Sequence, residues 1–498
     1  MNETDVLIIG GSFSGAAAAL LLRREAPHLS ITIVERSEKF DRKVGEALTE
    51  ISGAFLTKRL GLTHHLNHHH IVKNGLRFWF VANDETTFET AGELGASINV
   101  QLPTYQVDRE VLDRYLLGLA VTSGATLLRP AQVKDWKTEA GRQLLTVESE
   151  TGTQEISARW VLDASGKAAW IARRKRFLRP VEDHPINAIW ARFHHVADFD
   201  CWEWRKRFPM YAKSVQVSRT SATNHLTGYG WWCWLIPLKG GDTSVGLVYD
   251  ERIYTPPEGA NLGERLLTHL RTHPLGRELF AAAEVVPGDV KAYSPLPYYS
   301  EKIAGPGWQI AGDAVGFMDP LYSAGLDYAS WTISAAVNRI KAEDAGTPID
   351  CDAINRDFQK SYHAWFSALY RQKYHYLADR PLMTAAYLMD LGLFFFGPVR
   401  EVVGCVHKGF ATLPFCGPVD SRVAKVMKFY NERLGSLGRQ KMERGIFGKT
   451  NNNVRRLVPG FHPSPFVWRH ILSGAALWLS EECKMLFLRL FHPIKKDT

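Results

Sequence analysis

Apolar runs separated by short polar turns predict alternating strands and helices near the start of the chain. The run from Asp5 to Ile9 is short and almost continuously apolar, which is typical of a buried parallel strand. It leads into a glycine-rich turn at residues 10–15 and then into the helix-forming stretch Ala16 to Arg24. A second apolar strand, Ile31 to Val34, ends at Glu35. This pattern predicts the strand–helix–strand unit that binds dinucleotides.

Further along the chain, the hydrophobic pattern predicts a second part that is rich in β-strands. Residues 160–162 form another apolar run, which ends in a tight turn at Asp163. Ala188 to His194 and Thr243 to Tyr249 alternate in the way that half-buried strands do. We therefore expect an α/β (α+β) fold with a Rossmann-like domain over residues 1–340. A β-rich substrate domain would be interleaved with it at about residues 70–105 and 185–300.

The C-terminal region, residues 341–498, is predicted to be mainly helical. Asp352 to Tyr374 carries an aromatic residue at every fourth position, which predicts one packed face of a long helix. Pro381 to Phe396 is strongly apolar but short for a membrane span, so a buried helix or a substrate lid is preferred. Val467 to Phe491 is apolar but interrupted by charges, and we expect an amphipathic helix docked on the nucleotide-binding domain. Contact with a membrane surface or a partner is the alternative.

Composition excludes several classes of protein. The chain has 498 residues and a net charge of +8 with Lys and Arg distributed along it, so a nucleic-acid partner is not expected. A basic surface could favour an acidic carrier protein, although a solvated surface explains it equally simply. The six cysteines are scattered, which argues against disulfides and a zinc site and favours the cytoplasm. The histidines at 64, 65 and 68–70 lack a supporting carboxylate or cysteine set, so no metal site is expected.

The glycine-rich turn has the chemistry needed to hold a pyrophosphate. Gly10 permits a tight turn, Gly15 permits close packing of the helix on the strand, and Glu35 can bind ribose hydroxyls. Ser12 stands where the second glycine usually lies, so we expect a looser approach of the backbone to the phosphate. The residues of this turn that we assign to the cofactor are Gly10, Ser12, Phe13, Ser14 and Gly15.

Three further segments resemble those of FAD-dependent flavoproteins. The sequence Gly312-Asp313-Ala314 resembles the element that meets the ribityl and pyrophosphate part of FAD. Residues 102–113 resemble the segment that opens a helix beside the cofactor, where Arg109 would contact the flavin unless it is only a surface arginine. Residues 160–166 resemble the segment near the adenine-side half. The resemblance implies a Rossmann-like FAD-binding domain whose further contacts are Arg42, Glu46, Arg109, Asp163, Gly312, Asp313, Pro320 and Gly325.

Residues 317–325 resemble the signature of flavin-dependent halogenases. Phe317, Pro320, Ser323 and Gly325 fit the pattern Phe-x-x-Pro-x-x-Ser-x-Gly. Ordinary flavin monooxygenases tend to carry a second glycine at the place of Ser323. The resemblance implies that chloride or bromide is held near Ser323, Ala324 and Gly325, with Phe317 beside it.

A second halogenase-like pattern lies in residues 231–237. Trp232 and Trp234 occupy the first two fixed positions of Trp-x-Trp-x-Ile-Pro, and the last two positions also match. In that family the bulky indoles would keep organic molecules away from the flavin, so that only a halide reaches it. A tryptophan-rich core strand is the alternative, because aromatic residues bury much area.

Lys73 is the candidate catalytic residue. In the halogenases a lysine at about this distance from a Gly-Glu element, here Gly45-Glu46, receives hypohalous acid as a hydrogen-bond partner or as a haloamine. An ammonium in an apolar tunnel suits this role because desolvation lowers its pKa and favours the amine. Arg77 is the rival for the position, and a surface lysine is the plain alternative. Tyr322 replaces the glutamate of tryptophan halogenases, which favours acceptors that activate themselves, such as phenols and pyrroles.

The resemblance, which covers residues 1–340, thus predicts a halogenase of the phenol and pyrrole type. It implies reduced FAD from a separate flavin reductase, O₂, a halide, and a small aromatic acceptor that is free or tethered to a carrier protein. One alternative keeps the fold but changes the reaction to that of a monooxygenase, dehydrogenase or reductase on an apolar substrate. Another is a non-catalytic flavin protein that binds a partner.

Overall fold

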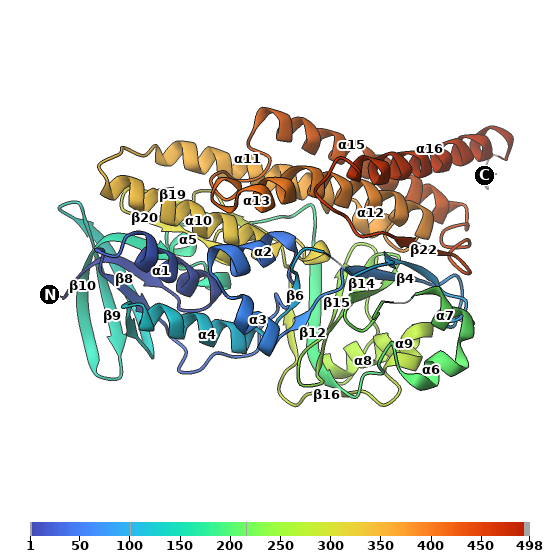
Figure 1. The fold of residues 1–498 in the computed structure, drawn as a ribbon, viewed down its shortest axis with the longest axis horizontal. Coiled ribbons are helices and arrows are strands. Elements are labelled where there is room, and N and C mark those ends of the chain that lie inside the picture. Colours follow the sequence, from blue (N-terminus) through green and yellow to red (C-terminus); the bar gives the residue numbers. More distant parts are fainter. Residues whose placement is uncertain (1, 100, 216, 493–498) are drawn as a thin grey trace.

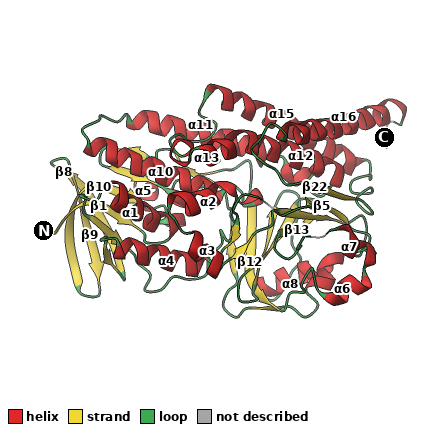
Figure 2. Cartoon of the chain, in the orientation of Figure 1, coloured by secondary structure: helices red, strands yellow, loops and turns green. Residues whose placement is uncertain are grey.

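Two lobes lie side by side beneath a layer of long helices in the computed structural model of the chain (Figure 1). The structure describes residues 2–99, 101–215 and 217–492. The lobe nearer the N-terminus is built on a mostly parallel sheet, and the other lobe on a mostly antiparallel one (Figure 2). The C-terminal helices cross above both lobes in this view. The arrangement confirms the predicted α/β (α+β) fold class.

The first sheet positions the dinucleotide turn. Its strand order is β19-β20-β10-β1-β2-β7, and the strands run parallel from β20 to β7. β1 is buried along its second half, as expected for a parallel strand covered on both faces. The strands are β1 (Asn2–Ile9), β2 (Ile31–Val34), β7 (Thr126–Leu128), β8 (Ala131–Glu139), β9 (Arg142–Ser149), β10 (Gly152–Asp163), β19 (Ala304–Gly305) and β20 (Trp308–Ile310). Its helices are α1 (Phe13–Glu25), α4 (Arg109–Thr122), α5 (Trp170–Arg174) and α10 (Gly325–Asp344).

The second sheet has nine strands and is the main sheet of the other lobe. Its order is β16-β12-β15-β14-β13-β4-β5-β22, with β17 paired to β12. The strands are β4 (Leu76–Phe80), β5 (Gly92–Ala96), β12 (Ile186–His194), β13 (Thr223–Gly228), β14 (Trp231–Pro237), β15 (Thr243–Asp250), β16 (Glu284–Val285), β17 (Lys291–Tyr293) and β22 (Arg455–Val458). The helices of this lobe are α6 (Trp202–Arg207), α7 (Pro209–Ser214), α8 (Leu262–Thr272) and α9 (Pro274–Leu279). β22 comes from the C-terminal region and pairs with β5, although no strand was expected there from the sequence.

Short elements join the lobes. They are α2 (Glu50–Ala54), the π-helical turn η1 (Phe55–Arg59), α3 (Thr63–His69), β3 (Ile71–Val72), β6 (Tyr105–Gln106), β11 (Leu178–Pro180), β18 (Tyr298–Ser300) and β21 (Gly316–Phe317). The 3₁₀ turns are η2 (Gly166–Ala168), η3 (Gly312–Ala314), η4 (Leu321–Ser323) and η5 (Lys373–His375). η4 leads directly into α10, so the residues of the halogenase-like signature form one continuous turn between the lobes.

The helical layer comprises the C-terminal third of the chain. Its members are α11 (Cys351–Leu369), α12 (Arg380–Phe394), the π-helical turn η6 (Phe395–Val399), α13 (Arg400–Gly404), α14 (Val406–Gly409), α15 (Pro418–Glu443) and α16 (Val467–Phe491). The aromatic positions predicted for the first of these helices are buried, but α11 ends at Leu369 and Tyr374 lies in η5. The segment Arg380–Gly404 is long and apolar enough to cross a membrane, and 67% of its most apolar stretch is buried within the protein.

The docking of the last helix differs from the prediction. α16 packs along α12 and also against α15, whereas we expected it on the nucleotide-binding domain. The reason is visible in two glycines. A Cβ at Gly474 would lie 2.8 Å from the carbonyl oxygen of Ala385, and one at Gly392 would lie 2.5 Å from Ile471. The two helix backbones therefore approach each other closely, which a sequence pattern on one helix alone does not reveal.

Candidate active site

The glycine-rich turn after β1 forms a narrow cradle at the carboxyl end of the first sheet. Gly10 has φ +99°, and a Cβ at Gly15 would lie 1.8 Å from the carbonyl oxygen of Gly10. Both positions thus require glycine if α1 is to start this close to β1. Ser12 caps α1 without a side-chain hydrogen bond, and its hydroxyl donates instead to Asp113. The amide of Gly11 donates to the carboxylate of Glu35 at 2.7 Å, which fixes that acid beside the turn.

The distant flavin-like segments converge on this cradle. Gly312 has φ +66°, and a Cβ there would lie 2.0 Å from the Oγ of Ser14. The amide of Ala311 donates to the carbonyl of Asp163 at 2.9 Å, so the two segments follow neighbouring strands. The steric fit of Gly10, Gly15 and Gly312 leaves backbone amides able to approach a pyrophosphate, as a bound dinucleotide requires. The residues present therefore fit FAD.

Asp163 lies at the end of β10, where its carboxylate accepts hydrogen bonds from backbone amides of the following turn. Its side chain is completely buried, and its two oxygens accept from the amides of Ser165 at 2.9 Å and Ile171 at 2.6 Å. Burial raises the pKa of this carboxyl, although these hydrogen bonds oppose the shift. Asp163 thus shapes the turn after β10 and offers no free carboxylate to the adenine half of a cofactor.

A small cavity of about 130 Å³ lies where the first sheet, the second sheet and η4 meet. Trp232 and Trp234 line it from β14, and Arg109 lines it from the start of α4. Its other lining residues among those predicted from the sequence are Glu46, Asp313, Phe317, Pro320, Ser323 and Gly325. The structure therefore brings nine of the predicted residues to one place. Arg42 lies half-buried in the loop between β2 and α2. Its backbone carbonyl accepts a hydrogen bond from the Nζ of Lys291 at 2.6 Å.

Charges in the small cavity are held by specific partners. Arg109 donates to Asp113 at 3.1 Å and to the carbonyl of Val44 at 3.1 Å. Glu46 pairs with Arg192 at 2.9 Å. Burial nevertheless raises the pKa of Glu46 to about 7, because loss of hydration outweighs the arginine. Trp232 donates its indole N–H to Tyr374 at 3.1 Å, which fixes the ring in the cavity wall.

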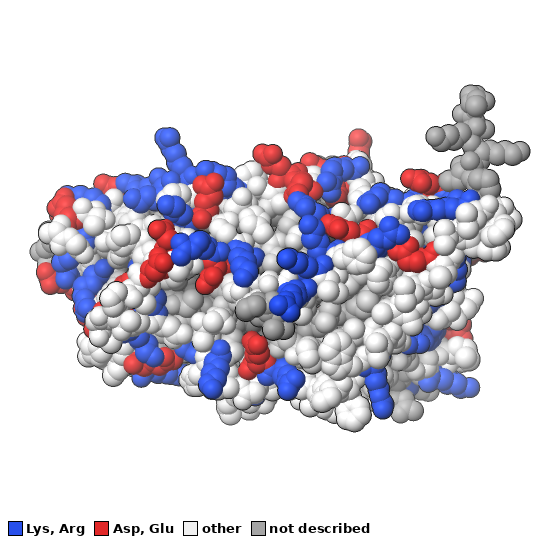
Figure 3. Space-filling model, turned by 90° about the horizontal axis from the view of Figure 1, so that it is seen from above, with Lys and Arg blue, Asp and Glu red and all other residues white. Residues whose placement is uncertain are grey.

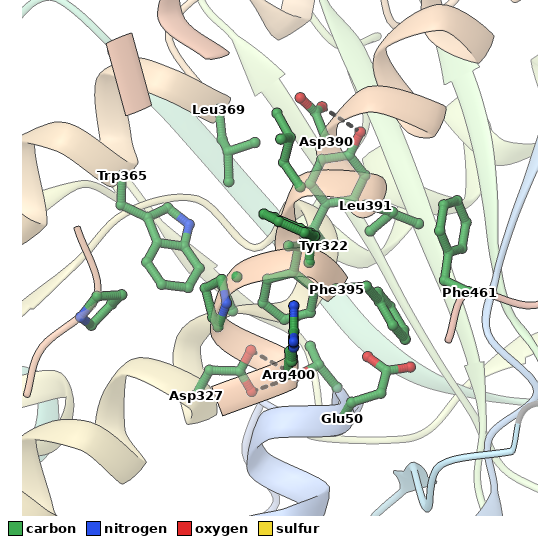
Figure 4. A pocket seen from close by; sticks show the side chains of 18 of the residues that line it. Glu50, Tyr322, Asp327, Trp365, Leu369, Asp390, Leu391, Phe395, Arg400 and Phe461 are labelled. Atoms are coloured by element: carbon green, nitrogen blue, oxygen red, sulfur yellow. Dashed lines mark hydrogen bonds between the residues drawn. The ribbon is translucent and has the colours of Figure 1, made fainter. Parts of the chain in front are cut away.

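A large cavity of about 550 Å³ lies on the other side of η4. Figure 4 shows its lining, in which Trp365 and Leu369 from α11, Phe395 from η6 and Phe461 surround an apolar interior. Glu50 and Asp327 lie toward the lower end in this view, on either side of Arg400, and Asp390 lies at the upper end. Most of this wall comes from the C-terminal helices. The strongly apolar stretch that predicted a buried helix or a lid, now α12 and η6, is therefore a wall of this cavity.

Lys73 lines the large cavity and is almost fully buried, with 3% of its surface exposed. Its Nζ donates to the carbonyl of Leu48 at 2.7 Å. Burial lowers the pKa of Lys73 to about 8, against the opposing charges of Glu50 and Asp327. The rival Arg77 lies instead in the core of the second sheet, ion-paired to Glu93.

One turn of backbone separates the two cavities. Along residues 320–327, Pro320, Ser323 and Gly325 face the small cavity, whereas Tyr322, Ala324 and Asp327 face the large one. Tyr322 and Ser323 have φ values of +67° and +60°, in the left-handed region that non-glycine residues seldom adopt. Such strain persists where surrounding contacts enforce it and gathers at functional sites. Here it lets consecutive side chains point into different cavities.

Three acidic residues of the large cavity were not found from the sequence. The carboxylate of Asp327 accepts from the Thr49 hydroxyl at 2.6 Å and from the amide of Ser52 at 3.0 Å, and burial raises its pKa to about 7. Burial likewise raises the pKa of Glu50. A signal existed only for Asp390, the single acid in an otherwise apolar helix.

Asp390 anchors a buried polar network behind Tyr322. It pairs with Lys373, and it accepts from the hydroxyls of Tyr322 at 3.1 Å and Tyr430 at 2.6 Å, and from Asn431 at 3.1 Å. Figure 4 shows the bond to Tyr322. Because Asp390 is saturated by these donors, it holds the tyrosine in place and does not present a free base.

Comparisons with known proteins find a matching family model and several similar proteins. The family model described as tryptophan halogenase matches residues 5–102 and 80–380. The flavin-dependent halogenase chlA of Dictyostelium discoideum is 27% identical over 374 residues, which cover 68% of this chain and 60% of that protein. The sulochrin halogenase gedL of Aspergillus terreus is 28% identical over 377 residues, or 69% and 64% of the two chains. This chain thus matches less than two thirds of the length of these relatives.

Solved structures show the same fold. The halogenase PltM in complex with phloroglucinol and FAD superposes with a TM-score of 0.73 and 16% identity, covering 97% of this chain and 96% of that one. The flavin-dependent brominase Bmp2 gives a TM-score of 0.65 and 20% identity, with 87% and 100% coverage. The likeness therefore extends into the helical C-terminal region, where the sequence offered no resemblance.

Proposed function

This chain belongs to the tryptophan halogenase family of FAD-dependent enzymes, and we propose that it halogenates an electron-rich aromatic ring, a phenol or a pyrrole. The observation that carries the proposal is the single turn at residues 320–327 between a flavin-side cavity and a cavity that contains Lys73. Such a wall suits a reaction in which a small oxidant is made on one side and used on the other. A separate reductase would supply reduced flavin, and we place the reaction in the cytoplasm.

The small cavity would hold the reacting end of the cofactor and the halide. When bound, reduced FAD supplies the electrons that activate O₂ for oxidation of the halide to hypohalous acid. Gly10, Gly15 and Gly312 would admit the pyrophosphate, and Arg109 would lie beside the ring system. Ser323, Ala324 and Gly325 lie at the start of α10, whose first amides and dipole favour an anion such as chloride or bromide. The packed indoles of Trp232 and Trp234 would exclude larger molecules.

The large cavity would carry out the transfer. With a pKa near 8, Lys73 is mostly ammonium at neutral pH and about one tenth amine. The ammonium can donate a hydrogen bond to hypohalous acid, whereas the amine can displace water from it and form an N–halogen bond. When the N–halogen bond forms, the O–halogen bond of hypohalous acid breaks, and the hydroxide that leaves takes up the proton lost by the nitrogen to give water. Either route delivers an electrophilic halogen at the Lys73 end of the cavity.

Glu50 is the carboxylate placed to assist the acceptor. It faces the large cavity close enough to Lys73 to interact with it electrostatically, and burial raises its pKa toward the range of a useful base. Taking the hydroxyl proton of a phenol would put negative charge on the ring that meets the halogen. Tyr322 stands directly before the motif serine, where tryptophan halogenases have a glutamate. It therefore adds no negative charge at this position. This arrangement supports a phenol more directly than a free indole.

The test is turnover with a flavin reductase in the presence and absence of bromide. Halogenated product should form only with halide, and Lys73→Ala should lower its yield by orders of magnitude while O₂-dependent flavin reoxidation continues. Lys302→Ala, an exposed lysine far along the chain, is the matched control and should behave as wild type. Loss of reoxidation together with product would place Lys73 at the flavin and contradict the division between the two cavities.

One observation favours a second function. The large cavity is lined mainly by aromatic and aliphatic side chains from α11, α12 and η6, which would suit oxidation of an apolar substrate without halogen. A monooxygenase of this kind would give product equally well with and without bromide. The same turnover experiment therefore decides between the two.

A further inference from the structure

The outer face of α16 presents large apolar side chains to solvent. Leu472, Leu479, Leu486 and Leu490 recur at spacings of seven, seven and four residues and are 66%, 56%, 55% and 67% exposed. Trp468, Phe487 and Phe491 are also exposed along the same helix. We call these seven residues the α16 stripe. Figure 3 looks down on the helical layer and shows uncharged surface toward the end where α16 lies, with both basic and acidic side chains beside it.

The stripe cannot turn inward, because the opposite face of α16 is already occupied. Gly474, Glu481 and Met485 are buried on that face. The close approach of Gly474 to the backbone of Ala385 fixes the rotation of the helix. The neighbouring α15 extends the apolar area with Val426 and Phe429, each 58% exposed, and the Phe429 ring lies 6.0 Å from Trp478. An apolar patch of this length on a soluble surface indicates a binding partner.

The charges around the stripe are predominantly positive. Both acids of α16 point toward α15, where Glu481 pairs with Lys441 at 2.7 Å and Glu482 pairs with Arg433 at 2.7 Å. Arg469 and Arg489 lie exposed near the two ends of the helix. Although Lys and Arg occur throughout the chain, residues 421–492 contain 13 of them against 4 Asp and Glu, a net +9. The net charge of the entire chain is only +8, so the excess lies in this region.

We propose that the α16 stripe binds the surface of an anionic lipid bilayer. A helix with Leu, Phe and Trp on its free face and arginines beside them lies in the interface, with its apolar side chains among the acyl chains. Anionic headgroups would neutralise the basic flank. A second copy packed on the same stripe would instead bring the basic flanks of two chains together. Nucleic acid would leave the leucines in water.

Binding in this orientation would place the mouth of the large cavity at the bilayer. The ring of Trp468 lies 4.8 Å from that of Phe396, which lines the cavity. Arg400, exposed at the start of α13, lines it as well. The stripe therefore begins at the rim of the cavity. The proposal does not depend on the reaction catalysed there.

Flotation of the full-length protein with lipid vesicles tests the proposal. We expect the wild type to float with vesicles of phosphatidylcholine and phosphatidylserine, less with phosphatidylcholine alone, and less again as salt is raised. Leu479→Glu/Leu486→Glu should lower the bound fraction by about tenfold or more, since two exposed leucines lose their burial in lipid. Arg469→Glu/Arg489→Glu should weaken the preference for phosphatidylserine, because it makes both ends of the stripe acidic and lowers the net charge of this region by four.

Met210→Glu is the matched control, because Met210 is 62% exposed on α7 of the other lobe. It should float as wild type does, and retained FAD binding would show that each variant folds. The proposal is overturned if the wild type stays with the soluble fraction or if the leucine variant floats equally well. It is also overturned if light scattering shows a wild-type dimer that Leu479→Glu/Leu486→Glu converts to monomer, since the stripe would then join two copies.

Discussion

Replacing Lys73 by methionine should change how the stability of the protein depends on alkaline pH. Burial lowers the pKa of Lys73 from 10.5 to about 8, whereas in the unfolded chain the same lysine titrates near its ordinary value. Between these two values the unfolded state holds one proton more than the folded state. The free energy of unfolding of the wild type therefore rises with pH between these two values. The Lys73→Met variant lacks this rise, because methionine does not titrate.

The expected size follows from the shift. A pKa lowered from 10.5 to about 8 corresponds to about 3 kcal/mol, which is the cost in folding stability of burying the Lys73 ammonium. This cost is fully present below pH 8 and absent above pH 10.5. Methionine has nearly the volume of lysine, so it leaves no large cavity. Loss of the donor to the Leu48 carbonyl costs about 1–3 kcal/mol, but that contribution is independent of pH. The free energy of unfolding of the wild type minus that of Lys73→Met should thus rise by about 3 kcal/mol from pH 7.5 to 10.5.

Urea unfolding of the two proteins at several pH values, followed by tryptophan fluorescence, measures this difference. Subtracting one curve from the other removes groups that both proteins share. Lys449→Met is the control, because Lys449 is exposed and its replacement should leave the pH dependence parallel to wild type. Parallel curves for Lys73→Met as well would show that the Lys73 ammonium is hydrated in the folded protein. Lys73 would then not be a reactive amine in a dry cavity.

Other predictions follow from single contacts. Gly15→Val should abolish FAD binding measured by titration, since its side chain would collide with the Gly10 carbonyl, whereas Gly118→Ala on open α4 surface should bind normally. Asp390→Asn should destabilise the protein by about 3 kcal/mol in denaturant unfolding, because it leaves Lys373 charged and buried without its partner. Glu50→Gln should lower kcat for phenols of high pKa more than for acidic phenols, in steady-state assays. Free tryptophan should compete poorly with phenols in mixed-substrate turnover.

The cofactor side of the site was predictable because its constraints are local. A strand followed by Gly10 and Gly15 has few conformations, and the same steric demand that the sequence suggested appears as close backbone approaches. The resemblance to flavin-dependent halogenases rested on residues that stay close in sequence, and the family match confirms it. Asp163 shows the limit of such reasoning. Its position in the motif was clear from the sequence. Only the fold reveals that its carboxylate accepts hydrogen bonds from backbone amides.

The acceptor side could not be predicted, since it is assembled from distant segments. Thr49 and Asp327 share a hydrogen bond across 278 positions, and Tyr322 meets Asp390 across 68. No periodicity in either segment encodes the partner in the other. The same holds for α16, whose sequence shows an apolar helix but not which side of it is covered. The covered side is set by the close approach of α16 and α12 at Gly474 and Gly392, which depends on the sequences of both helices.

The position of β22 has a consequence for the protein while it is being made. β5 is completed early in synthesis, but its parallel neighbour β22 emerges roughly 360 residues later, which at about 5–20 residues per second is a delay of roughly 20 to 70 seconds. During that time β5 is an open sheet edge that could pair with another nascent chain. Glu93, the second of the five residues of β5, is paired in the folded protein with Arg77 and Arg219, both of which are synthesised before β22. When β22 arrives, Arg455 comes within 3.9 Å of Glu93 and joins Arg77 and Arg219 around it. Pairing of β22 with β5 therefore closes the open sheet edge and at the same time adds a third arginine to the buried carboxylate of Glu93.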